Sequence, residues 1–182
     1  MFTFHLFRRT PSNEPPKRGS PRKATLPIKE DMEIEACCNG NVLTGPTLFY
    51  DVDGVLHPND TGNLSCADVL TSITSQIPGL QLVMSSNWRE TMDLEFFQRI
   101  FPKEIVNRTV GFTPVLSAPP YRRQREIEVF TSYFGISRFI CIDDQERLYE
   151  PGWPNLHLIE RSRGLDECSI EKIVRYFSEG SQ

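Results

Sequence analysis

The chain has 182 residues, of which 38% are hydrophobic and 24% are charged. This length supports one domain with a sizeable core, and the composition excludes a fibrous or wholly disordered protein. The net charge of −4 is unevenly spread, because residues 1–29 hold seven Lys or Arg against one Asp or Glu, and the rest holds thirteen against twenty-three. A basic tail on an acidic body can bind anionic partners or remain solvated, and charge alone leaves both open.

The first 45 residues are rich in Pro, Ser, Arg and Lys, a composition that predicts a disordered extension before a globular domain at residues 46–182. The apolar start reaches Arg8 after seven residues, too short for a signal-peptide core or a membrane span. We therefore expect a cytoplasmic protein without a membrane partner. Mitochondrial import is the weaker alternative, since prolines in the tail disfavour an amphipathic helix. The five cysteines are odd in number and lack Cys-x-x-Cys spacing, so we expect reduced thiols.

Short apolar runs alternate with longer amphipathic stretches along the rest of the chain. The expected strands are 47–50, 80–84, 105–110, 139–142 and 156–159, and the expected helices are 65–76, 91–100, 121–134 and 166–177. Thr91 is a candidate N-cap, and Gly135 is a helix-stop signal. This alternation predicts an α/β fold in which crossover helices link parallel strands.

Polar side chains follow three of these strands at the point where each ends. They are Asp51 and Asp53, Ser85 and Ser86, and Asp143 and Asp144. In an open parallel sheet, ligands bind beyond the carboxyl ends of the strands, so we expect one shared site.

The clustered carboxylates need a cation or a proton. Two like charges about 4 Å apart repel by roughly 4 kcal/mol at an effective dielectric near 20. Carboxylate oxygens suit Mg²⁺, which also binds substrate phosphate. An isolated Asp-x-Asp-Gly is more often a surface turn, but the preceding strand and the later acidic pair favour a site. A calcium loop fits less well, because Gly54 and Val55 occupy positions that would carry other residues.

The segment from Asp51 to Leu56, Asp-Val-Asp-Gly-Val-Leu, resembles the first signature of the haloacid dehalogenase-like (HAD) phosphohydrolases. The resemblance implies a three-layer α/β/α Rossmann-like fold with a central parallel sheet. It also implies that Asp51 is the nucleophile, forming a phospho-aspartate, and that Asp53 is the general acid and base. His57 has no counterpart in the signatures, and we interpret it as a loop residue.

Residues further along resemble the second and third signatures. Ser86 resembles the hydroxyl residue that holds a phosphoryl oxygen, with Asn87 beside it and Ser85 as a close rival. Arg123 resembles the basic residue that neutralises phosphate, and Arg122 and Arg125 remain alternatives. Trp88 is expected to be a packing residue, with a platform for substrate as the weaker alternative.

The run from Phe139 to Asp144 resembles the fourth signature, an apolar strand closed by metal ligands. The resemblance implies a Mg²⁺ cofactor held by Asp51, Asp53, Asp143 and Asp144. The separate roles of Asp143 and Asp144 stay open, and Asp144 could instead cap the following turn.

The spacing between signatures leaves no room for a sizeable cap domain, since the two intervals are about 33 and 37 residues. An open site suits phosphate on a macromolecule, either a nucleic-acid end or a phosphoprotein. The motifs are also similar to HAD modules of RNA-repair proteins, which favours nucleic-acid ends. We therefore expect a Mg²⁺-dependent phosphatase. The alternatives are a non-catalytic binding module and a receiver-like phospho-acceptor domain; the natural substrate and oligomeric state are not predicted.

Overall fold

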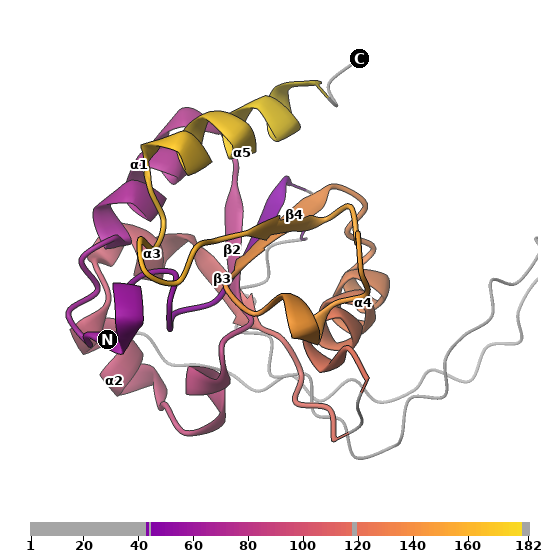
Figure 1. Cartoon of the computed structure of the whole chain (residues 1–182), viewed down its shortest axis with the longest axis horizontal. Coiled ribbons are helices and arrows are strands. Elements are labelled where there is room, and N and C mark those ends of the chain that lie inside the picture. Colours follow the sequence, from indigo (N-terminus) through magenta and orange to yellow (C-terminus); the bar gives the residue numbers. More distant parts are fainter. Residues whose placement is uncertain (1–42, 44, 118–119, 180–182) are drawn as a thin grey trace, which may run out of the picture. The chain divides into compact units, whose positions relative to one another are not determined.

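Five short strands form one parallel sheet in the computed structural model, which describes residues 43, 45–117 and 120–179. The strands are β1 (Thr47–Tyr50), β2 (Gln81–Met84), β3 (Thr109–Phe112), β4 (Phe139–Asp143) and β5 (Leu156–Leu158). Their order in the sheet is β3-β2-β1-β4-β5, with β1 at the centre (Figure 1). The expected α/β fold with a parallel sheet is confirmed.

Helices connect these strands and cover both faces of the sheet. They are α1 (Ala67–Gln76), α2 (Leu94–Ile100), α3 (Lys103–Arg108), α4 (Arg122–Phe134) and α5 (Glu167–Glu179), with short 3-10 helices η1 (Pro58–Asp60), η2 (Asn87–Glu90) and η3 (Glu146–Leu148). Between Asp53 and Arg123, the described residues form only these short elements and no inserted domain. The sequence expectation of no sizeable cap agrees with this.

The alternating direction of the side chains along β1 explains why helices cover both faces of the sheet. Leu48 faces a cluster that includes Leu70 of α1 and Ile173 of α5, whereas Phe49 faces a second cluster that includes Phe130 of α4. Successive side chains on a strand point to opposite faces, so a fully buried strand needs helices on both. Figure 1 shows α4 on one side of the sheet and α1 and α5 on the other.

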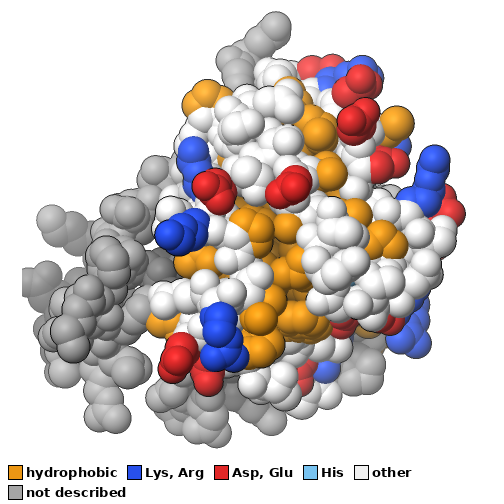
Figure 2. Space-filling view, turned by 90° about the vertical axis from the view of Figure 1, so that its left-hand side faces the viewer, with side chains coloured by type: hydrophobic (Ala, Val, Ile, Leu, Met, Phe, Trp, Pro, Cys, Tyr) orange, Lys and Arg blue, Asp and Glu red, His pale blue; other side chains and the backbone are white. Residues whose placement is uncertain are grey.

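The larger cluster also has apolar side chains that are only partly buried, including Trp88 in η2, Met92 before α2 and Val106 in α3. Figure 2 looks onto the side of the molecule that carries α1, α2 and α3, and hydrophobic atoms are exposed there in a strip down the middle. This side of the molecule therefore carries an exposed apolar strip.

The prediction of a strand over residues 105–110 is wrong in its first part. Residues 103–108 form α3, and the strand β3 starts at Thr109. Only Ile105 of α3 is buried, so one helical turn is enough to place it against the core. A two-residue apolar run such as Ile105-Val106 fits a strand and a helical turn equally well, which is why periodicity failed here.

The prediction that Thr91 caps the next helix is also wrong. Helix α2 begins at Leu94, and Asp93 is its N-cap, with the carboxylate accepting a 2.7 Å hydrogen bond from the Phe96 N–H. A carboxylate at this position satisfies a helix N–H that otherwise lacks a partner. The stop signal at Gly135 is confirmed, since this residue ends α4 at φ 68°.

The predicted disordered extension lies outside the described residues except for its end, so that boundary stays a prediction. Cys66, Cys141 and Cys168 are free thiols, while Cys37 and Cys38 also lie outside the described part. Within that part, no helix combines the length and the apolar character needed to cross a bilayer.

Candidate active site

The sheet register brings the ends of three strands together. Tyr50 at the end of β1 pairs with Met84 of β2 and with Ile142 of β4. Asp51 therefore lies one residue past β1, beside Ser85, which is one residue past β2, and Asp143, the last residue of β4. Backbone hydrogen bonds extend the sheet by this one step, because the Asp51 N–H donates to the Ile142 carbonyl at 3.1 Å.

Arg123, in the first turn of α4, is the cation at this edge. Its side chain is 2% exposed, and Nη1 lies 2.8 Å from Oδ2 of Asp143 and 3.3 Å from Oδ1 of Asp51. Its Nη2 donates to Oδ1 of Asn87 at 3.2 Å. The charges of Asp51 and Asp143 raise the pKa of Arg123 despite its burial, so it stays protonated.

The two other candidate arginines point elsewhere. Arg122 lies against Glu90 and Glu126, with Nε 2.8 Å from Oε1 of Glu126. Arg125 is 43% exposed and only approaches Glu128, at 3.9 Å. Of the three basic residues opening α4, Arg123 is thus the one placed beside Asp51.

Three carboxylates, from Asp51, Asp143 and Asp144, form what we call the strand-end carboxylate group. They offer oxygens that all lie within 4.8 Å of one another. Burial, reinforced by the charge of Asp51, raises the pKa of Asp143 to about 7. Two arginines face these three carboxylates, Arg123 and Arg161, and Arg161 also pairs with Asp60, so the negative charge of the group is not fully compensated.

The residues of this group fit a hard divalent cation. Oδ1 of Asp144 is buried and has no hydrogen-bond partner on another residue of the described chain. Asp143, in contrast, accepts from the Tyr149 hydroxyl and from the Gln145 N–H, each at 2.8 Å, which fixes the orientation of its carboxylate. Clustered carboxylate oxygens, one of them unpartnered, are the ligand type that Mg²⁺ takes.

Gly54 makes room for Asp144. Its φ is 73°, and a Cβ at this position would lie 2.4 Å from Oδ2 of Asp144. The glycine in the Asp-x-Asp-Gly segment is therefore required both by its left-handed backbone and by the close approach. The same carboxylate oxygen pairs with Arg161, which also pairs with Asp60.

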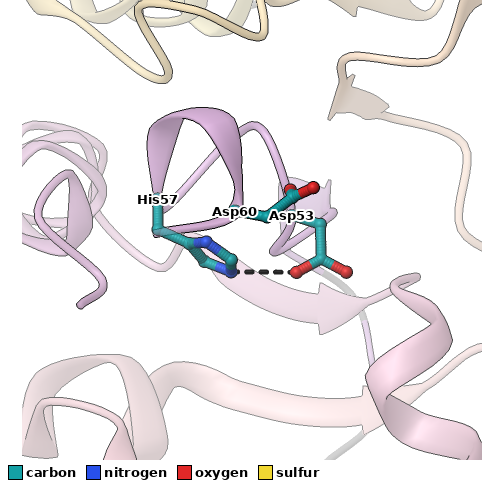
Figure 3. A group of neighbouring side chains, drawn as sticks. All are labelled: Asp53, His57 and Asp60. Atoms are coloured by element: carbon teal, nitrogen blue, oxygen red, sulfur yellow. Dashed lines mark ion pairs between the residues drawn. The ribbon is translucent and has the colours of Figure 1, made fainter. Parts of the chain in front are cut away.

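A second group of possible ligands, which we call the Asp53 group, consists of Asp53, His57 and Asp60 (Figure 3). In His57, Nδ1 accepts a hydrogen bond from the Gly62 N–H at 3.2 Å, so in the neutral imidazole the proton is on Nε2. Nε2 faces Asp53 at 2.9 Å from Oδ1, although it is not aligned as a good hydrogen bond. A nitrogen that carries a proton has no lone pair for a metal, so this group is not arranged as a cation site.

Trp88 fixes the same carboxylate from another side. Its Nε1–H donates a 2.9 Å hydrogen bond to Oδ1 of Asp53, and its ring centroid lies 5.7 Å from that of His57. The Asp53 side chain is 37% exposed, whereas His57 is 2% exposed. Sequence reasoning missed both contacts: Trp88 was expected to be a packing residue rather than a substrate platform, and His57 was interpreted as a loop residue.

Hydrogen bonds also fix the backbone of the segment that contains Ser85 and Ser86. Ser86 caps η2, accepting from the Trp88 N–H at 3.4 Å, whereas Ser85 Oγ is buried with no hydrogen-bond partner within the described residues. The guanidinium of Arg89 donates to the carbonyls of both serines, at 2.7 and 2.6 Å, and pairs with buried Glu126 of α4. Arg89 is a positioning residue that sequence reasoning did not single out.

A family model described as "HAD domain in Swiss Army Knife RNA repair proteins" matches residues 47–170, from β1 into α5, which is more than half of the chain. No curated protein matches the chain.

Proposed function

We propose that this chain, which belongs to the family of HAD domains in Swiss Army Knife RNA repair proteins, is a Mg²⁺-dependent phosphatase. Domains of the HAD type are generally hydrolases, and phosphatases are frequent among them. The observation that carries the proposal for this chain is the placement of Arg123 between Asp51 and Asp143 at the carboxyl edge of the sheet. This arrangement offers a nucleophile, a phosphate-neutralising cation and metal ligands within one site.

The nucleophile is Asp51. Oδ1 of this carboxylate accepts from the Val52 N–H at 2.9 Å and lies near Arg123, which leaves Oδ2 as the oxygen that attacks phosphorus. The bond to the leaving oxygen breaks as the Asp51–phosphorus bond forms, giving a phospho-aspartate. Arg123, Asn87 and the hydroxyl of Ser86 or Ser85 hold the phosphoryl oxygens.

Asp53 moves the protons. Its Oδ1 is held by Trp88, so its Oδ2 donates a proton to the departing oxygen and then takes one from the water that hydrolyses the phospho-aspartate. Asp51, Asp143 and Asp144 would hold Mg²⁺. Asp53, which the resemblance also implies as a ligand, lies outside this group of carboxylate oxygens, and its side chain is assigned to proton transfer instead. When bound there, Mg²⁺ neutralises charge on the transferring phosphoryl group and on the carboxylates around it.

The substrate in this proposal is a phosphate on a macromolecule, and a nucleic-acid end is preferred to a phosphoprotein. Two observations support this choice. The described residues form no inserted cap over the site, and the family model takes its name from RNA repair proteins. A large substrate can itself exclude water from an open site.

The test is phosphate release from p-nitrophenyl phosphate and from phosphorylated oligonucleotides, with Mg²⁺ or EDTA, comparing wild type with Asp51→Asn. Asn keeps the size of the side chain and removes the nucleophilic charge. We expect metal-dependent release that falls at least about 1,000-fold in Asp51→Asn. The matched control is Asp60→Asn, which changes a nearby acid that is paired with Arg161 and should retain activity.

A wild-type protein that binds Mg²⁺ but releases no phosphate from any of these substrates would contradict the proposal. It would favour a non-catalytic HAD module that binds a partner. A stable phospho-aspartate that can be isolated would instead indicate a phospho-acceptor domain.

A further inference from the structure

A pocket of about 350 Å³ lies next to the proposed acid and base, lined by Trp88, Thr91, Met92, Asp93 and Phe96. The residues that line it come from η2, α2 and the segment between them, on the side of the molecule that carries the exposed apolar strip. Ligand pockets commonly range from about 300 Å³ upward, so this one accommodates a single small group.

The reaction geometry connects this pocket to the substrate. A general acid must lie within hydrogen-bond reach of the oxygen that it protonates. Oδ1 of the Asp53 carboxylate accepts a 2.9 Å hydrogen bond from the Trp88 indole N–H, so the oxygen that Oδ2 protonates departs from the same carboxylate that the indole holds. The same tryptophan lines the pocket.

The pocket walls have the chemistry of a stacking site. Trp88, Met92 and Phe96 supply two aromatic rings and a thioether, and each is only partly buried. The rings of Trp88 and Phe96 lie 6.5 Å apart and are tilted by 51°, which leaves an open angle between them. Aromatic and thioether walls favour a planar, polarisable ring.

A positive charge lies next to Phe96, outside the residues that line the pocket, and the carboxylate of Asp93 is among the lining residues. The guanidinium carbon of Arg99, an exposed residue of α2, lies 5.4 Å from the centroid of the Phe96 ring. A substrate that places a ring on Phe96 and a further anionic group outside the pocket would meet this charge. A nucleotide at the end of a nucleic acid has both features, whereas a phosphoserine has no ring.

We propose that this pocket binds the base of the terminal nucleotide whose phosphate is removed, so that the substrate is a phosphorylated nucleic-acid end. This inference rests on the proposed phosphatase function. It assigns base stacking to Phe96 and Met92, which hold the leaving group and take no part in the bond-breaking step. Stacking is tolerant of base identity, so little discrimination among the four bases is expected.

The experiment compares two substrates that differ only in the base, adenosine 5′-monophosphate and ribose 5-phosphate, with adenosine 3′-monophosphate added to cover the other end. The full chain is used as wild type, Phe96→Ala and Met92→Ala. Tyr133→Ala is the matched control, because Tyr133 is an exposed aromatic residue (60%) on α4.

We expect at least one nucleotide to be hydrolysed with a kcat/KM about tenfold above that of ribose 5-phosphate. Phe96→Ala and Met92→Ala should bring the ratio of the two kcat/KM values towards one, by lowering kcat/KM for the nucleotide more than kcat/KM for ribose 5-phosphate. Tyr133→Ala should retain the preference. Equal kcat/KM for all three substrates in wild type would overturn the inference while leaving the phosphatase function intact.

A phosphotyrosine peptide provides the competing arm. If it is preferred to both nucleotides, and Phe96→Ala removes that preference, the pocket takes a phenol ring and the nucleobase assignment is wrong. If p-nitrophenyl phosphate and all other substrates fail, the proposed function fails separately. Calorimetric binding then decides: tighter binding of the nucleotide than of ribose 5-phosphate, lost in Phe96→Ala, supports the pocket, and equal binding overturns it.

Discussion

Two groups of side chains at the same sheet edge each bring possible metal ligands within 4.8 Å of one another, yet they are built differently. In the strand-end carboxylate group, the Asp143 side chain is fully buried and Asp144 has an oxygen without a partner. Carboxylates of both groups accept hydrogen bonds or pair with arginine, but in the Asp53 group no buried oxygen is left without a partner in the described part of the chain, and its one nitrogen that faces the carboxylates is protonated in the neutral imidazole. His57 carries its proton on Nε2, Asp53 accepts from Trp88, and Asp60 pairs with Arg161.

The difference teaches that proximity of ligands does not define a cation site. In the strand-end carboxylate group, three carboxylates share Arg123 and Arg161, so negative charge remains uncompensated, whereas in the other group the Trp88 indole orients the single carboxylate of Asp53. The first arrangement suits a metal ion, and the second suits proton transfer. Four changes would sharpen or break this contrast.

The largest effect is expected from Arg123→Met, which removes the cation between Asp51 and Asp143. Two buried carboxylates would then face each other, costing about 3 to 5 kcal/mol of the free energy of unfolding in EDTA. Urea denaturation measures it. The matched control is Arg125→Met, whose exposed partner is 3.9 Å away and which should cost less than about 0.5 kcal/mol. Equal costs for the two variants would show that Arg123 is not the compensating charge.

Magnesium should stabilise wild type with a pH dependence set by Asp143. In the fold its pKa is about 7, above the usual value near 3.9 for an unfolded chain. The neutral carboxyl therefore contributes stability that is complete below about pH 4 and lost as pH rises to 7. At pH 8, saturating Mg²⁺ should raise Tm by about 5 °C, and by less at pH 5.

Thermal melts with Mg²⁺ or EDTA check this, with Asp143→Asn as the variant that should lose the shift at pH 8. A shift that persists in Asp143→Asn would place the cation elsewhere.

Trp88→Phe tests the Asp53 group by removing one hydrogen-bond donor and keeping an aromatic ring. A misplaced general acid matters most when the leaving group needs a proton. We expect kcat on glycerol phosphate to fall about 10- to 100-fold, with p-nitrophenyl phosphate affected less than about threefold. Steady-state kinetics on both substrates measure the ratio. An equal loss on both would mean that Trp88 supports only the local packing.

The smallest effect is expected from Asp60→Asn. Asp60 and Arg161 are each nearly half exposed, so their ion pair should contribute less than about 1 kcal/mol. The Tm increase with Mg²⁺ should be unchanged in this variant. Loss of that increase would mean that the Asp53 group, rather than the strand-end carboxylate group, binds the cation.

The sequence by itself determined the sheet and where its polar ends lie. Strands such as 47–50 are short apolar runs that stop at a carboxylate. Because such a strand is buried on both faces, most of its residues are apolar, and the strand can be recognised from a few neighbouring residues. It failed at Ile105, where a two-residue apolar run fits a strand and a helical turn alike. It also failed at Thr91, because Asp93 is nearer the first helical residue and a carboxylate caps well.

Only the tertiary structure decided which arginine meets Asp51 and which residues hold Asp53. Arg122, Arg123 and Arg125 are chemically alike, and the rotation of α4 against the sheet points just Arg123 at the carboxylates. Trp88 reaches Asp53 across 35 residues of sequence, and Arg161 reaches Asp60 across 101. Local periodicity carries no information about such contacts, because they are set by the packing of whole elements.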